Sequence, residues 1–420
     1  MTSHMTRMAA ALLLAGAASL SFAQASSPGA EAPAKHWTTS WIAPPEPTWA
    51  KDFALPLAMP AELNDSTLRQ HLRVSLGGDR IRLVIDNAYS DRPLKVGAAH
   101  VALEDGKAGA KATFQGAPDI IVAAGAKAVS DPIALPVPDA ARLQVDIYLP
   151  GPAPLAGFHW DAREVTLLLP GNAAGRPRQA KGEKLPTRAF LSAVLVESAR
   201  KPATVVALGD SITDGNGATV GADHRWPDVL ARRLQPEGVA VLNAGISGNR
   251  LLRPGMGESA LARLERDVLQ QTGVQAVVVL LGTNDIGWPG GAFAPDEPLP
   301  SLDALTQGFR QLVVQAHLRG VRVIGATVTP FEDALKGTPL EGHYSPRKDA
   351  LRQALNTWIR TSGVFDGVAD FDRLLRDAQR PSRLRAEYDS GDHLHPSDAG
   401  YRAMAELIDL QGLRGGSDGR

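Results

Sequence analysis

The chain has 420 residues, 44% of them hydrophobic, which is enough apolar material for two packed cores. Its 44 Lys and Arg residues balance 45 Asp and Glu residues, and a formal net charge of −1 provides no field that would attract a nucleic acid or an anionic membrane. The absence of cysteine excludes disulfides and a thiol nucleophile. We therefore expect two domains stabilised by packing alone, and no nucleic-acid partner.

The N-terminus has the pattern of a secretory signal peptide. Arg7 precedes an apolar stretch over residues 8–20, and small residues follow up to Ala23. A membrane anchor is the alternative, but the apolar run is shorter than the roughly 18 to 20 residues that cross a bilayer. We predict cleavage after Ala23 or Ala25, export to the periplasm or the exterior, and a mature protein that has a flexible lead-in over residues 24–35 and no membrane span.

Residues 36–198 alternate between apolar and polar side chains with the period of two that is typical of strands. Two such runs, residues 72–76 and 81–85, flank Gly77-Gly78-Asp79 and predict a β-hairpin. Residues 143–149 repeat the pattern. Frequent Gly and Pro, without a helical stripe, indicate an antiparallel β-sandwich of the jelly-roll kind.

From residue 199 to 414 continuous apolar strands alternate with amphipathic helices, which predicts a parallel α/β sheet covered on both faces. Functional residues then belong at the carboxyl ends of the strands. A short flexible tail, residues 415–420, follows. The expected strands are Ala203 to Leu208, Val239 to Leu242, Gln275 to Leu281, Val321 to Thr327 and Val364 to Phe371, and the expected helices are Arg225 to Leu234, Glu258 to Leu269, Asp303 to Leu318, Arg347 to Arg360 and one after Pro396.

Two glycine-containing clusters follow the first two strands of this half. In Gly209 to Gly215, Ser211 has the placement of an exposed nucleophile, with backbone amides directed at the same space. In Asn243 to Arg250, Gly248 leaves its amide open to a ligand oxygen. Taken alone, the first cluster is explained equally well by an ordinary turn. The second, taken alone, is explained equally well by a simple connection from a strand to a helix.

Two further clusters complete a catalytic set. Asn284, after the third strand, has an amide suited to an oxyanion, although a local backbone cap is its commoner role. Asp392 lies three residues before His395, a spacing that lets the acid orient the imidazole towards a serine. A metal site at these residues and their neighbours, and His393 as the base, are the alternatives. Together the four clusters supply a nucleophile, oxyanion donors, a base and an orienting acid.

These residues resemble the SGNH/GDSL hydrolases over roughly residues 203–410. Ser211, Gly248 and Asn284 match the first three family blocks, and Asp392 with His395 matches the closing Asp-x-x-His-Pro. The resemblance implies a three-layer, flavodoxin-like α/β domain and a serine esterase in which the amides of Ser211 and Gly248 and the side chain of Asn284 hold the oxyanion. No metal or organic cofactor is implied.

The longer motifs resemble bacterial arylesterases and acylhydrolases associated with xylan degradation. A β-sandwich before the catalytic part is similar to carbohydrate esterases that remove acetyl groups from polysaccharides, which implies short-chain, acetyl esters of a small molecule or a polysaccharide as substrates. A lipase, arylesterase or thioesterase and a non-catalytic carbohydrate-binding protein are the alternatives. In the β-rich half, Trp37, Trp41, Trp49 and Trp160 either bind carbohydrate or belong to the core. That half otherwise shapes one edge of the active site or is a structural partner only. The candidate substrate-binding residues are Asp210, Asn249, Asp285, Trp288, His343 and Tyr344.

Overall fold

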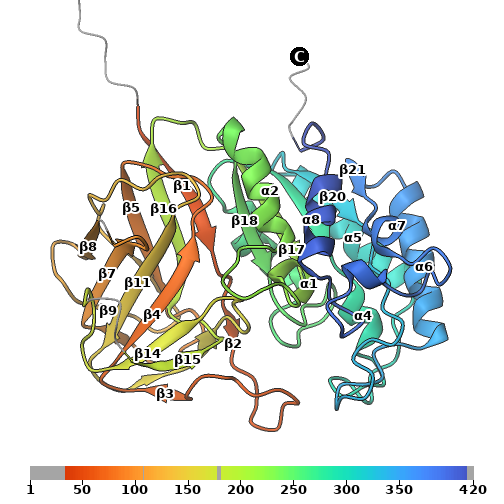
Figure 1. The fold of residues 1–420 in the computed structure, drawn as a ribbon, viewed down its shortest axis with the longest axis horizontal. Coiled ribbons are helices and arrows are strands. Elements are labelled where there is room, and N and C mark those ends of the chain that lie inside the picture. Colours follow the sequence, from red (N-terminus) through yellow and green to blue (C-terminus); the bar gives the residue numbers. More distant parts are fainter. Residues whose placement is uncertain (1–33, 107, 177–180, 414–420) are drawn as a thin grey trace, which may run out of the picture. The chain divides into compact units, whose positions relative to one another are not determined.

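The structure, a computed structural model, describes residues 34–106, 108–176 and 181–413. The predicted signal peptide, most of the lead-in and the C-terminal tail lie outside these residues. Lys35–Arg420 form one compact unit. Within it, antiparallel strands occupy the chain up to Ser198 and parallel strands begin at Thr204, as Figure 1 shows. The assignment of the two halves to separate domains stays a prediction.

The first half contains two antiparallel sheets that enclose one apolar core. The core is made by the inward-facing residues of both sheets, such as Leu68 and Val145 from one and Leu83 and Val194 from the other. The smaller sheet has the order β1 (His36–Ile42), β16 (Leu191–Ser198), β5 (Arg80–Asp86), β10 (Lys127–Val129), and the larger has the order β15 (Glu183–Leu185), β14 (Thr166–Pro170), β4 (Ser66–Arg73), β11 (Arg142–Leu149), β7 (Ala98–Leu103), β8 (Gly109–Ala112). Three two-stranded ribbons pair β2 (Glu46–Pro47) with β13 (Gly157–Phe158), β3 (Glu62–Leu63) with β12 (Ala153–Pro154), and β6 (Leu94–Val96) with β9 (Ile120–Val122).

The predicted hairpin over residues 72–85 is wrong. β4 and β5 belong to different sheets, and the chain crosses from one to the other at Gly77-Gly78. A Cβ on Gly77 would lie 2.0 Å from the carbonyl oxygen of Val137, so the crossing requires glycine. The alternation of apolar and polar residues predicts strands in this region because it marks which face of a strand is buried. It does not show which other strand lies beside it.

The second half is a five-stranded parallel sheet with helices on both faces, which confirms the predicted fold class. Its order is β18 (Ala240–Gly245), β17 (Thr204–Gly209), β19 (Val274–Leu280), β20 (Arg322–Ala326), β21 (Gly367–Ala369). One face packs against α2 (Trp226–Leu234), α7 (Phe371–Leu375) and α8 (Asp398–Leu407), and the other against α3 (Ala260–Leu264), α5 (Leu302–His317) and α6 (Pro346–Thr361). The short helices are α1 (Ser211–Asp214), α4 (Thr283–Gly287), the 3₁₀ turns Gln235–Glu237 and Ala386–Tyr388, and a π-helical turn, Glu265–Leu269, that continues α3.

The register of the parallel sheet brings three strand ends to one edge. Gly209 of β17 lies opposite Gly245 of β18 and Leu280 of β19. The segments that follow these residues carry Ser211, Gly248 and Asn284 in the sequence. The fold therefore gathers three of the predicted clusters at the centre of the sheet's carboxyl edge.

The two halves share an interface along β1 and β18, which lie side by side. The hydroxyl of Ser75 accepts a hydrogen bond from the Val241 amide at 2.8 Å. Arg73 and Arg142 both pair with Asp223, at 2.7 and 2.5 Å.

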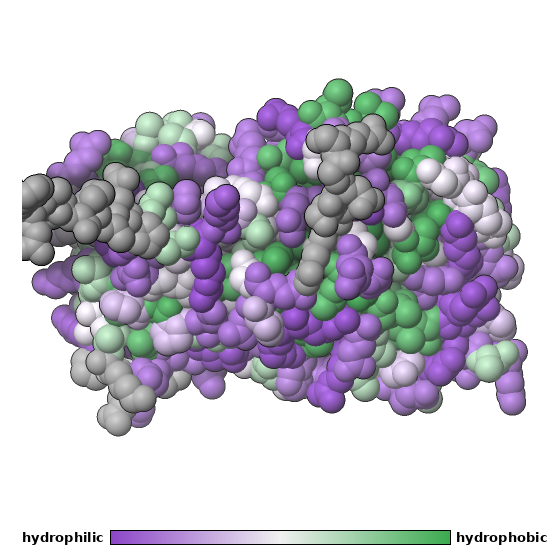
Figure 2. Space-filling view, turned by 90° about the horizontal axis from the view of Figure 1, so that it is seen from above, coloured by the Kyte–Doolittle hydropathy of each residue, from purple (hydrophilic) through white to green (hydrophobic). Residues whose placement is uncertain are grey.

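On the face seen in Figure 2, hydrophilic residues are interspersed with smaller groups of hydrophobic ones.

Candidate active site

Ser211 is the first residue of α1, immediately beyond the end of β17. Asp210 caps the helix by accepting a hydrogen bond from the Ile212 amide at 3.0 Å. Gly209 has no room for a side chain, because a Cβ there would lie 2.0 Å from the Thr213 hydroxyl oxygen. This tight turn leaves the Ser211 hydroxyl facing a pocket.

His395 and Asp392 form a hydrogen-bonded chain with this hydroxyl. The Ser211 oxygen is 2.8 Å from Nε2 of His395, and Nδ1 of His395 is 2.6 Å from the Asp392 carboxylate. Burial opposes the ionisation of Asp392, but hydrogen bonds from the His395 ring and from the backbone amides of His395 and Leu394 hold its pKa well below the usual range. The carboxylate is therefore charged at neutral pH and fixes a proton on Nδ1, which leaves Nε2 able to accept the serine proton.

The neighbouring His393 does not reach the serine. Its Nδ1 atom is 2.5 Å from Asp389, and its backbone has a φ of 63°. The two histidines therefore belong to two separate His–Asp pairs. In the described part of the chain, no group of three or more His, Asp or Glu side chains is arranged to hold a metal ion.

Gly248 and Asn284 line the same pocket as Ser211. Gly248 has a φ of 71°, and a Cβ there would lie 2.4 Å from the sulfur of Met256, so only glycine fits. The Asn284 amide donates one hydrogen to the carbonyl oxygen of Asn249 at 3.0 Å. Its second N–H remains for a ligand oxygen.

The structure places Asp210, Asn249 and Asp285, three of the candidate substrate-binding residues, in the interior behind the pocket. All three are buried, and none lines the pocket. Asp285 accepts hydrogen bonds from the amides of Leu251 and Leu252 at 2.8 and 3.0 Å. Asn249 donates to the Glu258 carbonyl and accepts from Arg263. These side chains support the loops that carry the neighbouring residues.

Trp288 and His343 line the pocket, whereas Tyr344 does not. Trp288 stacks on Phe293 with ring centroids 4.6 Å apart and lies beneath the Arg250 guanidinium. Burial lowers the pKa of His343 to about 3, so this ring is uncharged at neutral pH. Tyr344 packs against Phe331 instead.

The first half of the chain contributes Leu55 and Trp160 to this pocket. Trp160 is held by its backbone amide, which donates to Glu46 at 2.9 Å, and by its indole N–H, which donates to the Pro56 carbonyl at 3.1 Å. Burial raises the pKa of Glu46 well above its usual range. Trp160 was singled out in the sequence only as an aromatic residue, and nothing there placed it beside the serine.

Among the described residues, the rest of the pocket lining carries no carboxylate, lysine or arginine. It consists of Asn216, Ser247, Met256, Phe293, Leu335, Leu340 and Leu394. The site can therefore hold a neutral, largely apolar group against the serine. No helix within the described residues is long and apolar enough to cross a membrane.

Comparisons with known proteins found a matching family model and similar solved structures. Residues 207–403 match the model of the GDSL-like lipase/acylhydrolase family. The chain is similar to solved structures of a lipase/acylhydrolase from Enterococcus faecalis (22% identity, TM-score 0.37, 49% of this chain and 92% of that one) and of a GDSL-like lipase from Bacteroides thetaiotaomicron VPI-5482 (18%, 0.37, 51% and 91%). It is also similar to that of an acetyl xylan esterase (18%, 0.35, 49% and 96%). No curated protein sequence matches the chain.

Proposed function

Because residues 207–403 match the model of the GDSL-like lipase/acylhydrolase family, we propose that this protein is a serine esterase with Ser211, His395 and Asp392 as its catalytic triad. The observation that carries the proposal is the continuous chain of hydrogen bonds through these residues, at 2.8 and 2.6 Å. Nucleophile, base and orienting acid stand in the order that acyl transfer requires.

The reaction follows from the positions of these groups. His395 removes the proton of Ser211 as its oxygen attacks the ester carbonyl, and Asp392 stabilises the resulting imidazolium. The oxyanion of the tetrahedral intermediate lies against the amides of Ser211 and Gly248 and the free N–H of Asn284. His395 returns the proton to the leaving alcohol, and water then releases the acid from the acyl-enzyme by the same steps. These groups require no metal or organic cofactor.

Three variants test the triad with p-nitrophenyl acetate. Ser211→Ala and His395→Ala are expected to abolish hydrolysis and leave the fold intact. His393→Ala is the matched control, because it removes an equally acid-paired histidine two residues away and is expected to keep activity. Full activity in Ser211→Ala would contradict the assignment. So would an inactive His393→Ala variant together with a fully active His395→Ala variant.

The substrate we propose is a short-chain, acetyl ester of a carbohydrate. The aromatic rings of Trp160, Trp288 and Phe293 in the pocket suit the apolar faces of a sugar, and they suit an aryl ester equally. Within the part of the lining that the structure describes, no Lys or Arg side chain is available to the phosphates of acyl-CoA, which disfavours a thioesterase acting on that substrate. A panel of acetyl-xylan, p-nitrophenyl acetate, longer acyl esters and acyl-CoA distinguishes these classes by kcat/KM.

We also propose that the protein is exported. The support is the basic Arg7 followed by the apolar residues 8–20 and small residues up to Ala23. N-terminal sequencing of the protein from the periplasm and the medium tests this, and an intact Met1 in the folded, active protein would contradict it.

A further inference from the structure

A buried series of hydrogen-bonded side chains connects the β-sandwich half to the loop that carries Ser247 and Gly248, which we call the oxyanion loop. His159 follows β13, and its Nε2 atom is 3.1 Å from the Asp214 carboxylate at the end of α1. The other oxygen of that carboxylate accepts a hydrogen bond from the Ser247 hydroxyl at 2.9 Å. Ser247 directly precedes Gly248, and its hydroxyl accepts a hydrogen bond from Asn216 at 3.1 Å. One carboxylate therefore joins the nucleophile's helix, the oxyanion loop and the first half of the chain.

The protons on His159 are fixed by its partners. Nδ1 is 3.0 Å from the Pro44 carbonyl oxygen, which can only accept, so Nδ1 carries a proton. Nε2 on the other side of the ring faces the Asp214 carboxylate at 3.1 Å. In the described part of the chain, His159 is the one basic side chain that pairs with this carboxylate.

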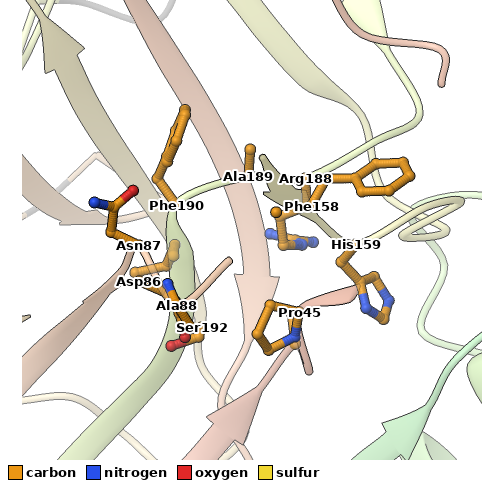
Figure 3. A pocket seen from close by; sticks show the side chains of 13 residues that line it. Pro45, Asp86, Asn87, Ala88, Phe158, His159, Arg188, Ala189, Phe190 and Ser192 are labelled. Atoms are coloured by element: carbon orange, nitrogen blue, oxygen red, sulfur yellow. The ribbon is translucent and has the colours of Figure 1, made fainter. Parts of the chain in front are cut away.

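The three side chains of this network are buried. His159, Asp214 and Ser247 are 7%, 1% and 2% exposed. Figure 3 shows His159 beside Pro45 at a small cavity within the first half, with Asn87 and Phe190 on the cavity's opposite side. A buried carboxylate that loses its hydrogen-bond partner carries a large desolvation cost, so Asp214 moves or draws in water when His159 is removed.

We propose that His159 is a positioning residue for catalysis: acting through Asp214 and Ser247, it holds the Gly248 amide where the oxyanion forms. The inference rests on the proposed esterase function. Displacing an oxyanion donor weakens binding of the transition state more than binding of the ester, because the charge on the oxygen exists only after attack. We therefore expect the loss of His159 to lower kcat and to leave KM nearly unchanged.

Two variants of similar size separate this role from a merely structural one. In His159→Asn the amide lies near the position of Nδ1 and keeps the bond to Pro44, but is too short to reach Asp214. In His159→Gln the amide reaches the position of Nε2 and keeps the bond to Asp214. We expect His159→Asn to lower kcat for p-nitrophenyl acetate about ten-fold or more, with KM within two-fold of the wild type, and His159→Gln to restore most of the loss.

Ser247, the next member of the hydrogen-bonded series, provides a second test. Ser247→Ala cuts the connection one step nearer Gly248 and is expected to lower kcat by a similar factor. Combining it with His159→Asn is then expected to add little, because both act through the same contacts. If His159→Asn does not fold, as judged by its thermal midpoint, the Ser247→Ala and His159→Gln variants decide the question.

His71→Asn is the matched control, because His71 also lies in the first half and pairs with an acid, Glu104, at 2.6 Å. It is expected to keep the wild-type kcat. Equal kcat values in the Asn and Gln variants of His159, a loss confined to KM, or a wild-type kcat in Ser247→Ala would overturn the proposal. If Ser211→Ala is inactive while these variants match the wild type, the esterase function stands and the role of His159 falls.

Discussion

Asp210, the residue before the nucleophile, is expected to make the protein less stable as the pH rises. Its carboxyl is buried, one oxygen accepts from the Ile212 amide, and the other has no partner among the described residues. Burial raises its pKa from 3.8 to about 7. The unfolded chain therefore loses this proton at a lower pH than the folded chain, and stability is lost between those two values. At about 1.4 kcal/mol per unit, the difference amounts to about 4 kcal/mol at pH 7 and above.

The assay compares Asp210→Asn with the wild type. Asparagine keeps an oxygen that can cap α1 but cannot ionise. Urea unfolding at a series of pH values from 4 to 8 is expected to show the variant gaining stability relative to the wild type until about pH 7, after which the difference is constant. The comparison isolates one carboxyl because all other titrating groups are shared.

Asp377→Asn is the control with the opposite sign. Asp377 accepts hydrogen bonds from the amides of Gln379 and Arg380, which lower its pKa. Its charged form stabilises the fold, so the loss caused by Asp377→Asn has its full size above the carboxyl's ordinary pKa and disappears as the pH falls below that value. A stability difference between Asp210→Asn and the wild type that stays constant across the whole pH range would refute the reasoning.

Three further predictions concern catalysis. Gly248→Ala is expected to lower kcat by about 10²–10³, because the new methyl group collides with Met256 and displaces an oxyanion donor; steady-state kinetics with p-nitrophenyl acetate measure it. Trp160→Ala is expected to raise KM for aryl or sugar esters about ten-fold through lost ring contacts, whereas Trp37→Ala, outside the pocket, leaves KM unchanged. Hydrolysis is expected to continue unchanged after exhaustive treatment with EDTA, and a loss that Zn²⁺ restores would contradict a metal-free mechanism.

The parts of the site that lie close together in the sequence, or at the ends of parallel strands, were predictable. Asp392 and His395 are three residues apart in one loop, so their pairing is local. Ser211, Gly248 and Asn284 follow neighbouring strands, and a parallel sheet brings such positions to one edge.

The direction of individual side chains was not predictable. Asp210 and Asp285 are adjacent to residues that face the pocket, yet both turn into the protein to satisfy backbone amides. In a tight turn, successive side chains point in different directions, and a motif does not show which one faces the ligand. Likewise, Tyr344 follows His343 in the sequence but packs against Phe331 and does not line the pocket.

Contacts between segments distant in the sequence were the second feature that the sequence could not predict. The hairpin at Gly77-Gly78 was wrong because strand alternation does not encode the partner strand. Leu55 and Trp160 reach the pocket only through the packing of one half of the chain on the other, and no local pattern records that packing. Predicting such contacts requires information on which distant segments meet.

Leu55 and Trp160 line the cavity from outside the stretch that the family model covers. Evolution is thus free to retune which esters are accepted by altering segments that contain no triad residue. Mutant libraries aimed at positions 49–57 and 160 offer the same freedom to an engineer. Conversely, replacing Leu55 and Trp160 by alanine would open the cavity on the side that these two residues close.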